Sequence, residues 1–356
     1  MPSRSRLDPR LWFAIVGLAI GVSASQPALG HAHDAIALEP PTEPMTGAPT
    51  EPLVAPPPAE PTWRFKQAER PVKVVVLAGS IGAWPKQPYA EELERLCRNV
   101  EVHNLSQVGQ GAWALKKRFK DQVLRNGRLK LRDESLEHWL VYGGGLNSVG
   151  TPKSTNKHMR DLFVLAHGHG MKVVGLSLTP WGDQSERKWR GFEGLEHRRV
   201  TQAVVDFTLG RLSPAQAFGE YGRKRPGGVE APWDPSELAD IGIDLYDSQL
   251  RDREAPVHDF EATRAALAKD AKWKRARAAL DEPARALALD IDAAVLAELP
   301  RWFLRKDLRS FDHIHPNAQG HEIIAATMCP TLPESWGCTC EPPVVAPEAS
   351  AVEQRE

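Results

Sequence analysis

The sequence predicts an α/β protein, a three-layer α/β/α sandwich around a parallel sheet of about five strands. The first observation is the run Val74–Leu77, which is apolar throughout and ends abruptly in Ala78-Gly79-Ser80. Strands of parallel sheets are buried on both faces and therefore read as continuous apolar runs. The second observation is that similar runs alternate with stretches of helical periodicity, as they do when each crossover between strands carries a helix.

The expected elements follow one another as strand, helix, strand, helix. Further strands are expected at Asn99–Leu105, His138–Tyr142, Met171–Leu178 and Ile241–Leu245. Helices are expected at Tyr89–Leu96, Ala112–Leu124, Asn156–His169 and His197–Leu209, with one or two surface helices in Phe260–Leu299 and a closing helix that ends near Met328. Right-handed crossovers between such strands give a flavodoxin-like arrangement.

The amino-terminal segment has the features of an export signal. Arg4, Arg6 and Arg10 precede an apolar run from Leu11 to Val22, which is shorter than the ~20 residues of a membrane span. We therefore expect a signal peptide at residues 1–30 and a secreted or periplasmic protein. An uncleaved membrane anchor is the alternative.

Three further segments are expected after the signal. A proline-rich linker spans residues 31–62, because its nine prolines between Pro40 and Pro61 favour a stiff, extended chain. The folded domain is expected at residues 63–336. Residues 337–356 end in a stretch rich in Pro, Ala and Glu and are expected to form a disordered tail.

The chain has four cysteines, Cys97, Cys329, Cys338 and Cys340. In an exported protein we expect disulfides, with a staple between the carboxyl-terminal region and Cys97 as one pairing. The sequence leaves the pairing open. Cys338 and Cys340 resemble a metal or redox motif, but no second ligand pair lies at a suitable spacing, so a structural role is favoured.

Composition gives no indication of a nucleic-acid partner. The formal net charge is −1, and 26% of the residues are charged, as in ordinary globular proteins.

Chemically distinctive residues stand where the expected strands end. Ser80 follows the first strand, Gly109 the second and Asn147 the third, whereas Asp312 and His315 precede the last helix. Open α/β sheets bind their ligands at the carboxyl ends of the strands. A serine hydroxyl becomes a nucleophile when an imidazole takes its proton, and the imidazole needs an acceptor on its other nitrogen. We therefore predict Ser80 as nucleophile, His315 as base and Asp312 as the partner of His315.

The same chemistry needs hydrogen-bond donors for the oxyanion that forms on the carbonyl oxygen. The backbone amides of Ser80 and Gly109 and the side-chain amide of Asn147 are the expected donors.

At these residues the sequence resembles the SGNH (GDSL-type) hydrolase family. Four blocks in order carry the resemblance, with Asp312–Pro316 and the following Asn317 the most specific of them. The others are Ala78–Ile81, Asn104–Gly109 and Gly145–Ser148. The resemblance spans residues 72 to 328 and implies a serine esterase of the SGNH hydrolase fold that uses no metal or organic cofactor.

Two positions depart from the family pattern. Gly79 replaces an aspartate that supports the turn before the nucleophile, and Ser148 replaces the aspartate after the oxyanion asparagine. The long separation of Ser80 and His315 indicates insertions at Asp183–Asp234 and Arg251–Arg309. Insertions at this place would shape a lid or a substrate cleft.

Other residues compete for functional roles. His313 is the alternative base, but the spacing from Asp312 and the proline that follows favour His315. His167 and His169 suggest a metal site, yet they are expected at the opposite end of the sheet and are interpreted as solvated or capping. Trp84 and Trp181 follow strands near the site, and substrate contact and core packing are equally expected for them.

The sequence thus predicts an exported serine hydrolase that cleaves an ester through an acyl-enzyme. An O-acetyl group on a carbohydrate is the favoured substrate, with lipid esters as an alternative. No stable membrane span is expected, and the oligomeric state stays open. One alternative is an O-acyltransferase with the same Ser80, His315 and Asp312. Another, favoured by Gly79, is a non-catalytic envelope protein that binds glycans.

Overall fold

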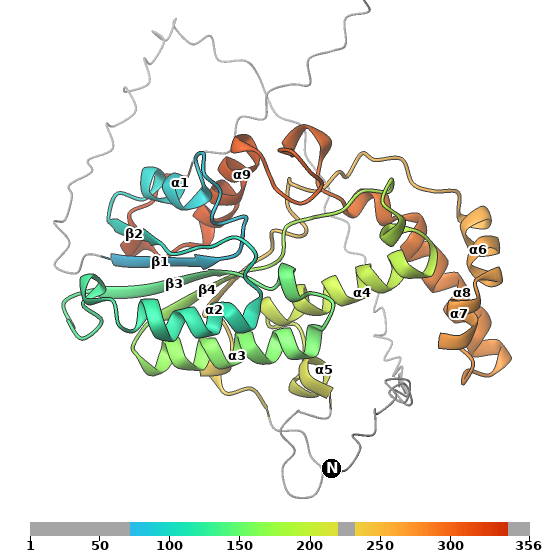
Figure 1. The fold of residues 1–356 in the computed structure, drawn as a ribbon, viewed down its shortest axis with the longest axis horizontal. Coiled ribbons are helices and arrows are strands. Elements are labelled where there is room, and N and C mark those ends of the chain that lie inside the picture. Colours follow the sequence, from blue (N-terminus) through green and yellow to red (C-terminus); the bar gives the residue numbers. More distant parts are fainter. Residues whose placement is uncertain (1–71, 220–231, 341–356) are drawn as a thin grey trace, which may run out of the picture. The chain divides into compact units, whose positions relative to one another are not determined.

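The computed structural model describes residues 72–219 and 232–340 (Figure 1). The signal segment expected at 1–30, the linker expected at 31–62 and residues 341–356 of the expected tail lie outside the described residues.

The described residues are built around a five-stranded parallel sheet with the strand order β2-β1-β3-β4-β5 (Figure 1). The strands are β1 (Val72–Ala78), β2 (Val100–Asn104), β3 (Glu137–Gly143), β4 (Lys172–Leu176) and β5 (Ile241–Ile243). All four pairings are parallel, and Val72 lies opposite Val100 on one side and Glu137 on the other. This order is the flavodoxin-like one, so the predicted fold class is confirmed.

Alternate residues of β1 face two different helical layers. Val75 and Leu77 belong to a core that includes α2 (Ala112–Arg118), α3 (Pro152–Gly168) and α4 (Gly191–Thr208). Val74 and Val76 belong to a second core, which includes α1 (Tyr89–Leu96) and α9 (Ala318–Met328). Every residue of β1 except Lys73 is fully buried. Because each buried valine or leucine contributes about 1.5–3 kcal/mol, the central strand is firmly held.

Several helices differ from their expected bounds. α3 begins at Pro152, which occupies the first helical position, and α4 begins at Gly191, ahead of His197. The helix expected at 112–124 is α2 followed by a π-helical turn at Phe119–Val123. A short helix that the sequence analysis missed, α5 (Pro214–Phe218), begins with a capping box formed by Ser213 and Gln216.

The region 260–299 holds three helices instead of the one or two expected. They are α6 (Phe260–Lys269), α7 (Ala271–Ala276) and α8 (Glu282–Ala297). The break after α6 lies at Asp270, whose carboxylate accepts hydrogen bonds from the amides of Lys272 and Trp273 and so begins α7. Leu195 of α4, Leu267 of α6 and Trp273 of α7 form a small buried core of their own.

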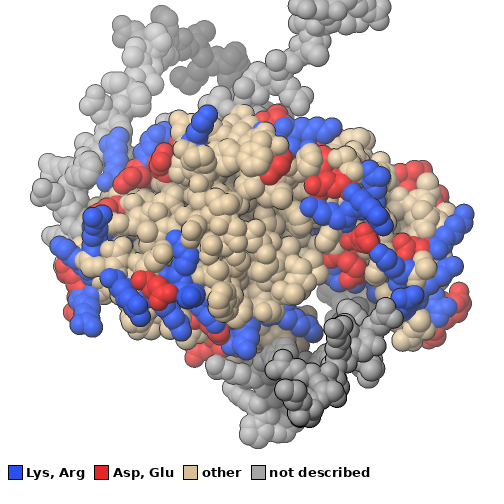
Figure 2. Space-filling model, in the orientation of Figure 1, with Lys and Arg blue, Asp and Glu red and all other residues tan. Residues whose placement is uncertain are grey.

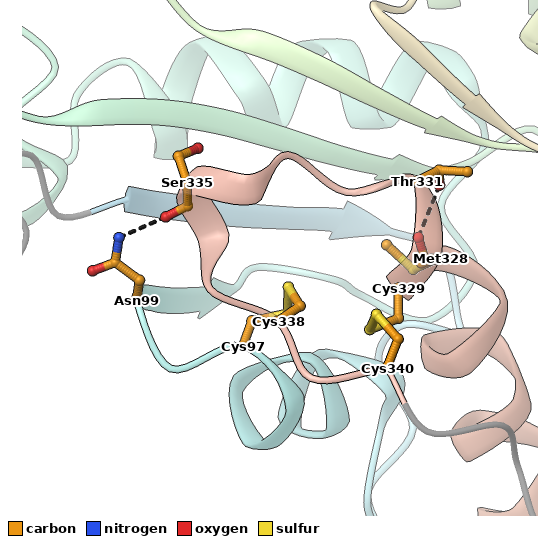
Figure 3. Close-up of a disulfide and its surroundings, with 8 residues drawn as sticks. All are labelled: Cys97, Asn99, Met328, Cys329, Thr331, Ser335, Cys338 and Cys340. Carbon is orange, nitrogen blue, oxygen red and sulfur yellow. Dashed lines mark hydrogen bonds between the residues drawn. A yellow bond between two sulfur atoms is a disulfide. The ribbon is translucent and has the colours of Figure 1, made fainter. Parts of the chain in front are cut away.

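Two disulfides hold the carboxyl-terminal end of the described fold (Figure 3). Cys97 pairs with Cys338, and Cys329 pairs with Cys340. The pairing between Cys97 and the carboxyl-terminal region is therefore present. Gly337–Cys340, which the sequence analysis placed in the tail, belong to the described fold because both disulfides and the hydrogen bond from Thr339 N to Leu96 O (2.9 Å) hold them.

Charges of both signs are interspersed on the face shown in Figure 2, where no large area carries one sign alone. Within residues 72–219 and 232–340, no helix has the length and apolarity needed to cross a membrane.

The two disulfides should differ in their contribution to stability. In the chain-entropy account the Cys97–Cys338 bond, which links positions 241 residues apart, restricts the unfolded chain more than the Cys329–Cys340 bond, whose positions are 11 apart. We expect the double change Cys97→Ala/Cys338→Ala to lower the free energy of unfolding by about 5 kcal/mol, and Cys329→Ala/Cys340→Ala by about 3 kcal/mol. Urea unfolding of the two variants measures both. An equal loss, or a larger one for the second variant, would contradict this order.

Candidate active site

Ser80 lies in a tight turn directly after β1. The amide of Ala83 donates to Gly79 O (3.1 Å), which closes the turn around Ser80. Side chains from the end of β2 and from the loop after it hold this turn. Ser106 Oγ accepts a hydrogen bond from Ala78 N (3.1 Å), and Asn104 Nδ2 donates to Gly82 O (2.8 Å). Ser80 is half-exposed although the strand before it is buried.

Asp312 organises the loop that precedes α9. Its Oδ1 accepts hydrogen bonds from the amides of Ile314 and His315, both at 2.8 Å, which closes a turn of the kind that aspartate favours. Its Oδ2 lies 2.8 Å from Nδ1 of His315. Ser310 binds His315 O through both its amide and its hydroxyl, each at 2.9 Å. The position of the imidazole is therefore fixed by its own loop.

The two loops meet, so that Ser80, His315 and Asp312 form one hydrogen-bonded chain. Nε2 of His315 lies 2.7 Å from Oγ of Ser80. With the imidazole proton on Nδ1, donated to Asp312, Nε2 is free to accept the hydrogen of the Ser80 hydroxyl. Burial alone would raise the pKa of Asp312, but the amides of His315 and Ile314 and the ring of His315 outweigh it and hold this pKa below its usual value. Asp312 is therefore ionised at neutral pH.

Asn147 lies beside the turn that carries Ser80. It belongs to a short 3₁₀ turn, Leu146–Ser148, after β3, and its side chain is exposed. Its Nδ2 donates to Gln110 O (3.2 Å). The same atom lies 3.1 Å from the place where a Cβ on Gly79 would stand. A side chain at position 79 would therefore require the Asn147 amide to shift by a few tenths of an ångström.

Gly109, the third expected oxyanion donor, lies in the exposed loop between β2 and α2. Its φ of +76° is a conformation that glycine adopts readily. The next residue, Gln110, contacts Asn147 through its carbonyl group. Ser148, expected to have a structural role, accepts a hydrogen bond from Ala112 N (3.2 Å) at the start of α2. The loop of Gly109 is thus tied to the turn of Asn147.

A charged cluster supports the His315 loop from the segment that follows β4. Arg309 donates to Asp183 Oδ2 (2.5 Å) and, through Nε and Nη2, to Leu304 O. Gly182 N donates to His313 O (2.8 Å). Burial opposes ionisation of Asp183, but the amide of Ser185 and the guanidinium of Arg309 outweigh it and hold its pKa well below the usual range. No sequence motif marks Asp183 or Arg309, so this pair is not predictable from the sequence.

His313, the alternative base, does not contact Ser80 in this arrangement. Its Nδ1 lies 3.2 Å from Arg309 Nη1 and 3.8 Å from Asp183 Oδ2, so its ring joins the supporting cluster. This leaves His315 as the histidine that faces Ser80.

Two rings, those of Trp84 and Phe311, stack nearly parallel to the reactive imidazole. Trp84 stacks on His315 with ring centroids 6.0 Å apart and on Phe311 at 5.8 Å, and Phe311 stacks on His315 at 5.2 Å. On its inner side Trp84 also stacks on the buried His321 (5.9 Å). Burial, with a smaller effect of His315, lowers the pKa of His321 to about 4, so this ring is neutral at pH 7.

The remaining residues named from the sequence have structural environments. His167 is not solvated as interpreted: its Nδ1 lies 2.8 Å from Ser236 O and its Nε2 2.8 Å from Asp240 Oδ2, which ties α3 to the segment before β5. His169 is the residue that caps the end of α3. No group of three His, Cys, Asp or Glu side chains suited to a metal occurs in the described part of the chain. Trp181 is buried and donates to Thr201 Oγ1 (3.2 Å), so it packs in the core.

Replacing Asp183 by asparagine should destabilise the protein in a pH-dependent way. The depressed pKa means that the carboxylate stabilises the fold above about pH 4 and loses this effect as the pH falls through its folded-state value. We expect Asp183→Asn to lower the free energy of unfolding by about 2 kcal/mol at pH 7, with the difference shrinking at acid pH. Chemical unfolding from pH 7 downwards measures this difference.

Asp307→Asn is the matched control, because Asp307 pairs with Arg305 on the surface (2.6 Å). A surface pair contributes about 0–1 kcal/mol. Equal losses in the two variants, or a loss in Asp183→Asn that does not change with pH, would refute the stabilising role of the Asp183 carboxylate.

Comparison with known proteins finds similar solved structures and nothing else. No protein-family model and no curated protein matches the chain. A GDSL-like lipase from Bacteroides thetaiotaomicron is 14% identical, with a TM-score of 0.39, over 74% of this chain and 88% of that one. A lipase/acylhydrolase from Enterococcus faecalis is 12% identical, with a TM-score of 0.38, over 76% and 98%. A catalytic mutant of an acetylxylan esterase from Geobacillus stearothermophilus is 12% identical, with a TM-score of 0.36, over 72% and 92%. Because these similarities are low, the site is interpreted from the distances within this chain.

Proposed function

We propose that this chain is a serine ester hydrolase of the SGNH type, with Ser80 as nucleophile, His315 as general base and Asp312 as the residue that orients His315. The observation that carries the proposal is the hydrogen-bonded chain from Ser80 Oγ through both nitrogens of His315 to Asp312 Oδ2, with contacts of 2.7 and 2.8 Å. These distances match what nucleophilic catalysis by serine needs, since an imidazole must take the hydroxyl proton and a carboxylate must hold the imidazolium that forms.

In the first half of the reaction Ser80 becomes acylated. Oγ forms a bond to the acyl carbon while its proton passes to Nε2 of His315. The tetrahedral intermediate then breaks its bond to the alcohol oxygen, which takes the proton back from Nε2 and leaves as a neutral alcohol. Asp312 stays ionised throughout and stabilises the imidazolium.

In the second half a water molecule takes the place of the alcohol. His315 accepts a proton from this water, whose oxygen forms a bond to the acyl carbon. The bond to Ser80 Oγ then breaks, Oγ regains a proton from Nε2, and the carboxylic acid leaves. The half-exposed positions of Ser80 and His315 give water the access that this step requires.

The oxyanion of both steps is stabilised by donors beside Ser80. Asn147 is proposed to contribute its Nδ2 atom, which borders the turn of Ser80 at Gly79. Gly109 and Ser80 are proposed to contribute their backbone amides.

The proposed substrate is an ester on an accessible surface, with O-acetyl groups of a carbohydrate as the favoured class. The site residues are half-exposed or exposed, and exposed apolar side chains stand nearby on both loops, Val108 (68% exposed) beside Gly109 and Phe311 (76%) beside Asp312. An open site with apolar surfaces suits a large polar substrate that presents one short acyl group. The two disulfides fit an oxidising compartment and support a secreted or periplasmic location.

A fluorophosphonate probe tests the nucleophile directly, because it phosphonylates only an activated serine. We expect the protein to be labelled, and we expect Ser80→Ala and His315→Ala to abolish labelling while both variants remain folded. His313→Ala is the matched control and should still be labelled, since His313 contacts Asp183 and Arg309 rather than Ser80. Gel fluorescence reads out the labelling, and circular dichroism reports on folding. A well-folded protein without labelling would overturn the proposal in favour of a glycan-binding role.

Removal of the Asn147 amide should slow catalysis without loss of stability. The loss of one oxyanion donor lowers kcat by about 10²–10³-fold. We expect this reduction for Asn147→Ala, and a larger one for Asn147→Asp, which places a negative charge beside the oxyanion. Steady-state hydrolysis of p-nitrophenyl acetate and thermal unfolding measure the two properties. An unchanged kcat in both variants would show that Asn147 has no part in the oxyanion site.

A further inference from the structure

Phe311 is the most exposed of the large apolar side chains in the described part of the chain, and it stands beside the proposed base. Its side chain is 76% exposed, and its ring lies 5.2 Å from that of His315 with an angle of 23° between the planes. Its backbone is held on both sides, because Ser310 binds His315 O and Asp312 closes the following turn. The ring therefore faces solvent from a loop whose backbone is hydrogen-bonded. Exposing so much apolar surface is unfavourable, and packing in the core does not explain it.

Trp84 extends this ring into a wall. It stacks on Phe311 with an angle of 15° between the planes and on His315 with an angle of 20°. Its inner side is supported by His321, which is fully buried and whose Nδ1 accepts a hydrogen bond from Tyr89 N (3.3 Å). Trp84 comes from the turn after β1 and Phe311 from the loop before α9, so the wall spans both loops that carry the site.

The chemistry of a serine hydrolase decides which part of the substrate lies at this wall. The alcohol oxygen receives its proton from Nε2 of His315, so it must come within hydrogen-bond distance of that atom. The groups attached to this oxygen then lie on the side of the imidazole. The acyl carbon and its oxyanion lie instead towards Ser80 and Asn147. An aromatic wall stacked around His315 is therefore placed to contact the alcohol part of the ester.

We propose that Phe311, supported by Trp84, forms the subsite for the alcohol part of the substrate and selects esters whose alcohol is a saturated ring, as in a sugar. The face of a pyranose presents several C–H groups that pack on an aromatic ring, whereas a small alcohol such as methanol offers only one methyl group. This assignment rests on the proposed function, since it needs His315 to be the group that protonates the alcohol. Beyond the proposed function, the assignment states that the enzyme distinguishes substrates by their alcohol part, through contacts with the rings of Phe311 and Trp84.

Two acetyl esters that give the same acyl-enzyme test the assignment. The substrates are methyl acetate and per-O-acetylated methyl glucoside, and the measured quantity is kcat/KM, which reports on acylation. The wild type should prefer the glucoside ester. Phe311→Ala should lower kcat/KM for the glucoside about tenfold more than for methyl acetate, in keeping with the strength of ring contacts. Phe311→Trp should retain the preference.

Leu287→Ala is the matched control, because Leu287 is an exposed apolar residue (61%) on α8, which carries none of the site residues. It should change neither rate. Equal losses on both substrates for Phe311→Ala would show that the ring only supports His315, and unchanged rates on both would show that it touches no substrate. Either result would overturn the assignment. The assignment would also be overturned if the wild type is labelled by the fluorophosphonate but has equal kcat/KM values for methyl acetate and the glucoside. A wild type that the fluorophosphonate does not label would overturn the proposed function itself, and the assignment with it.

Discussion

The contact between His315 and Ser80 is the interaction on which the arrangement of the site depends. It joins residues 235 positions apart, one directly after the central strand and the other directly before the last helix. A parallel sheet makes this contact available, because the loops after its strands gather at one edge. The rest of the fold keeps the two loops at hydrogen-bonding distance. β1 is buried between two helical layers and fixes the first loop, while Asp312 and Ser310 fix the second.

Support for the site reaches further than the residues that perform the chemistry. Asn104 and Ser106 hold the Ser80 turn from the strand next to it, and Asp183 with Arg309 holds the His315 loop from the segment that follows β4. These contacts come from the end of β2, the loop after it and the segments that contain Asp183 and Arg309, so distant parts of the chain hold the two loops of the site.

Much of the fold could be predicted from the sequence, because its signals are local. The apolar run before Gly79 predicted β1. The polar residues that follow the expected strands predicted that Ser80 and Asn147 would lie at the same edge of the sheet. Other features depend on contacts between distant residues. Asp183 and Arg309 lie 126 positions apart, and neither stands in a recognisable motif. The pairing of Cys97 with Cys338 and the break between α6 and α7 at Asp270 likewise needed the structure. The exposure of Phe311 also needed the structure, because an apolar residue is usually expected to be buried.

The central claim is that Ser80 carries the acyl group between the two halves of the reaction. The most direct test is intact-protein mass spectrometry, followed by peptide mapping, of the protein quenched within milliseconds of mixing with p-nitrophenyl acetate. Our account predicts one acetyl group per chain, located on the peptide that contains Ser80, and none on Ser80→Ala. Hydrolysis that proceeds with no acetylated peptide, or with the acetyl group on another residue, would contradict it.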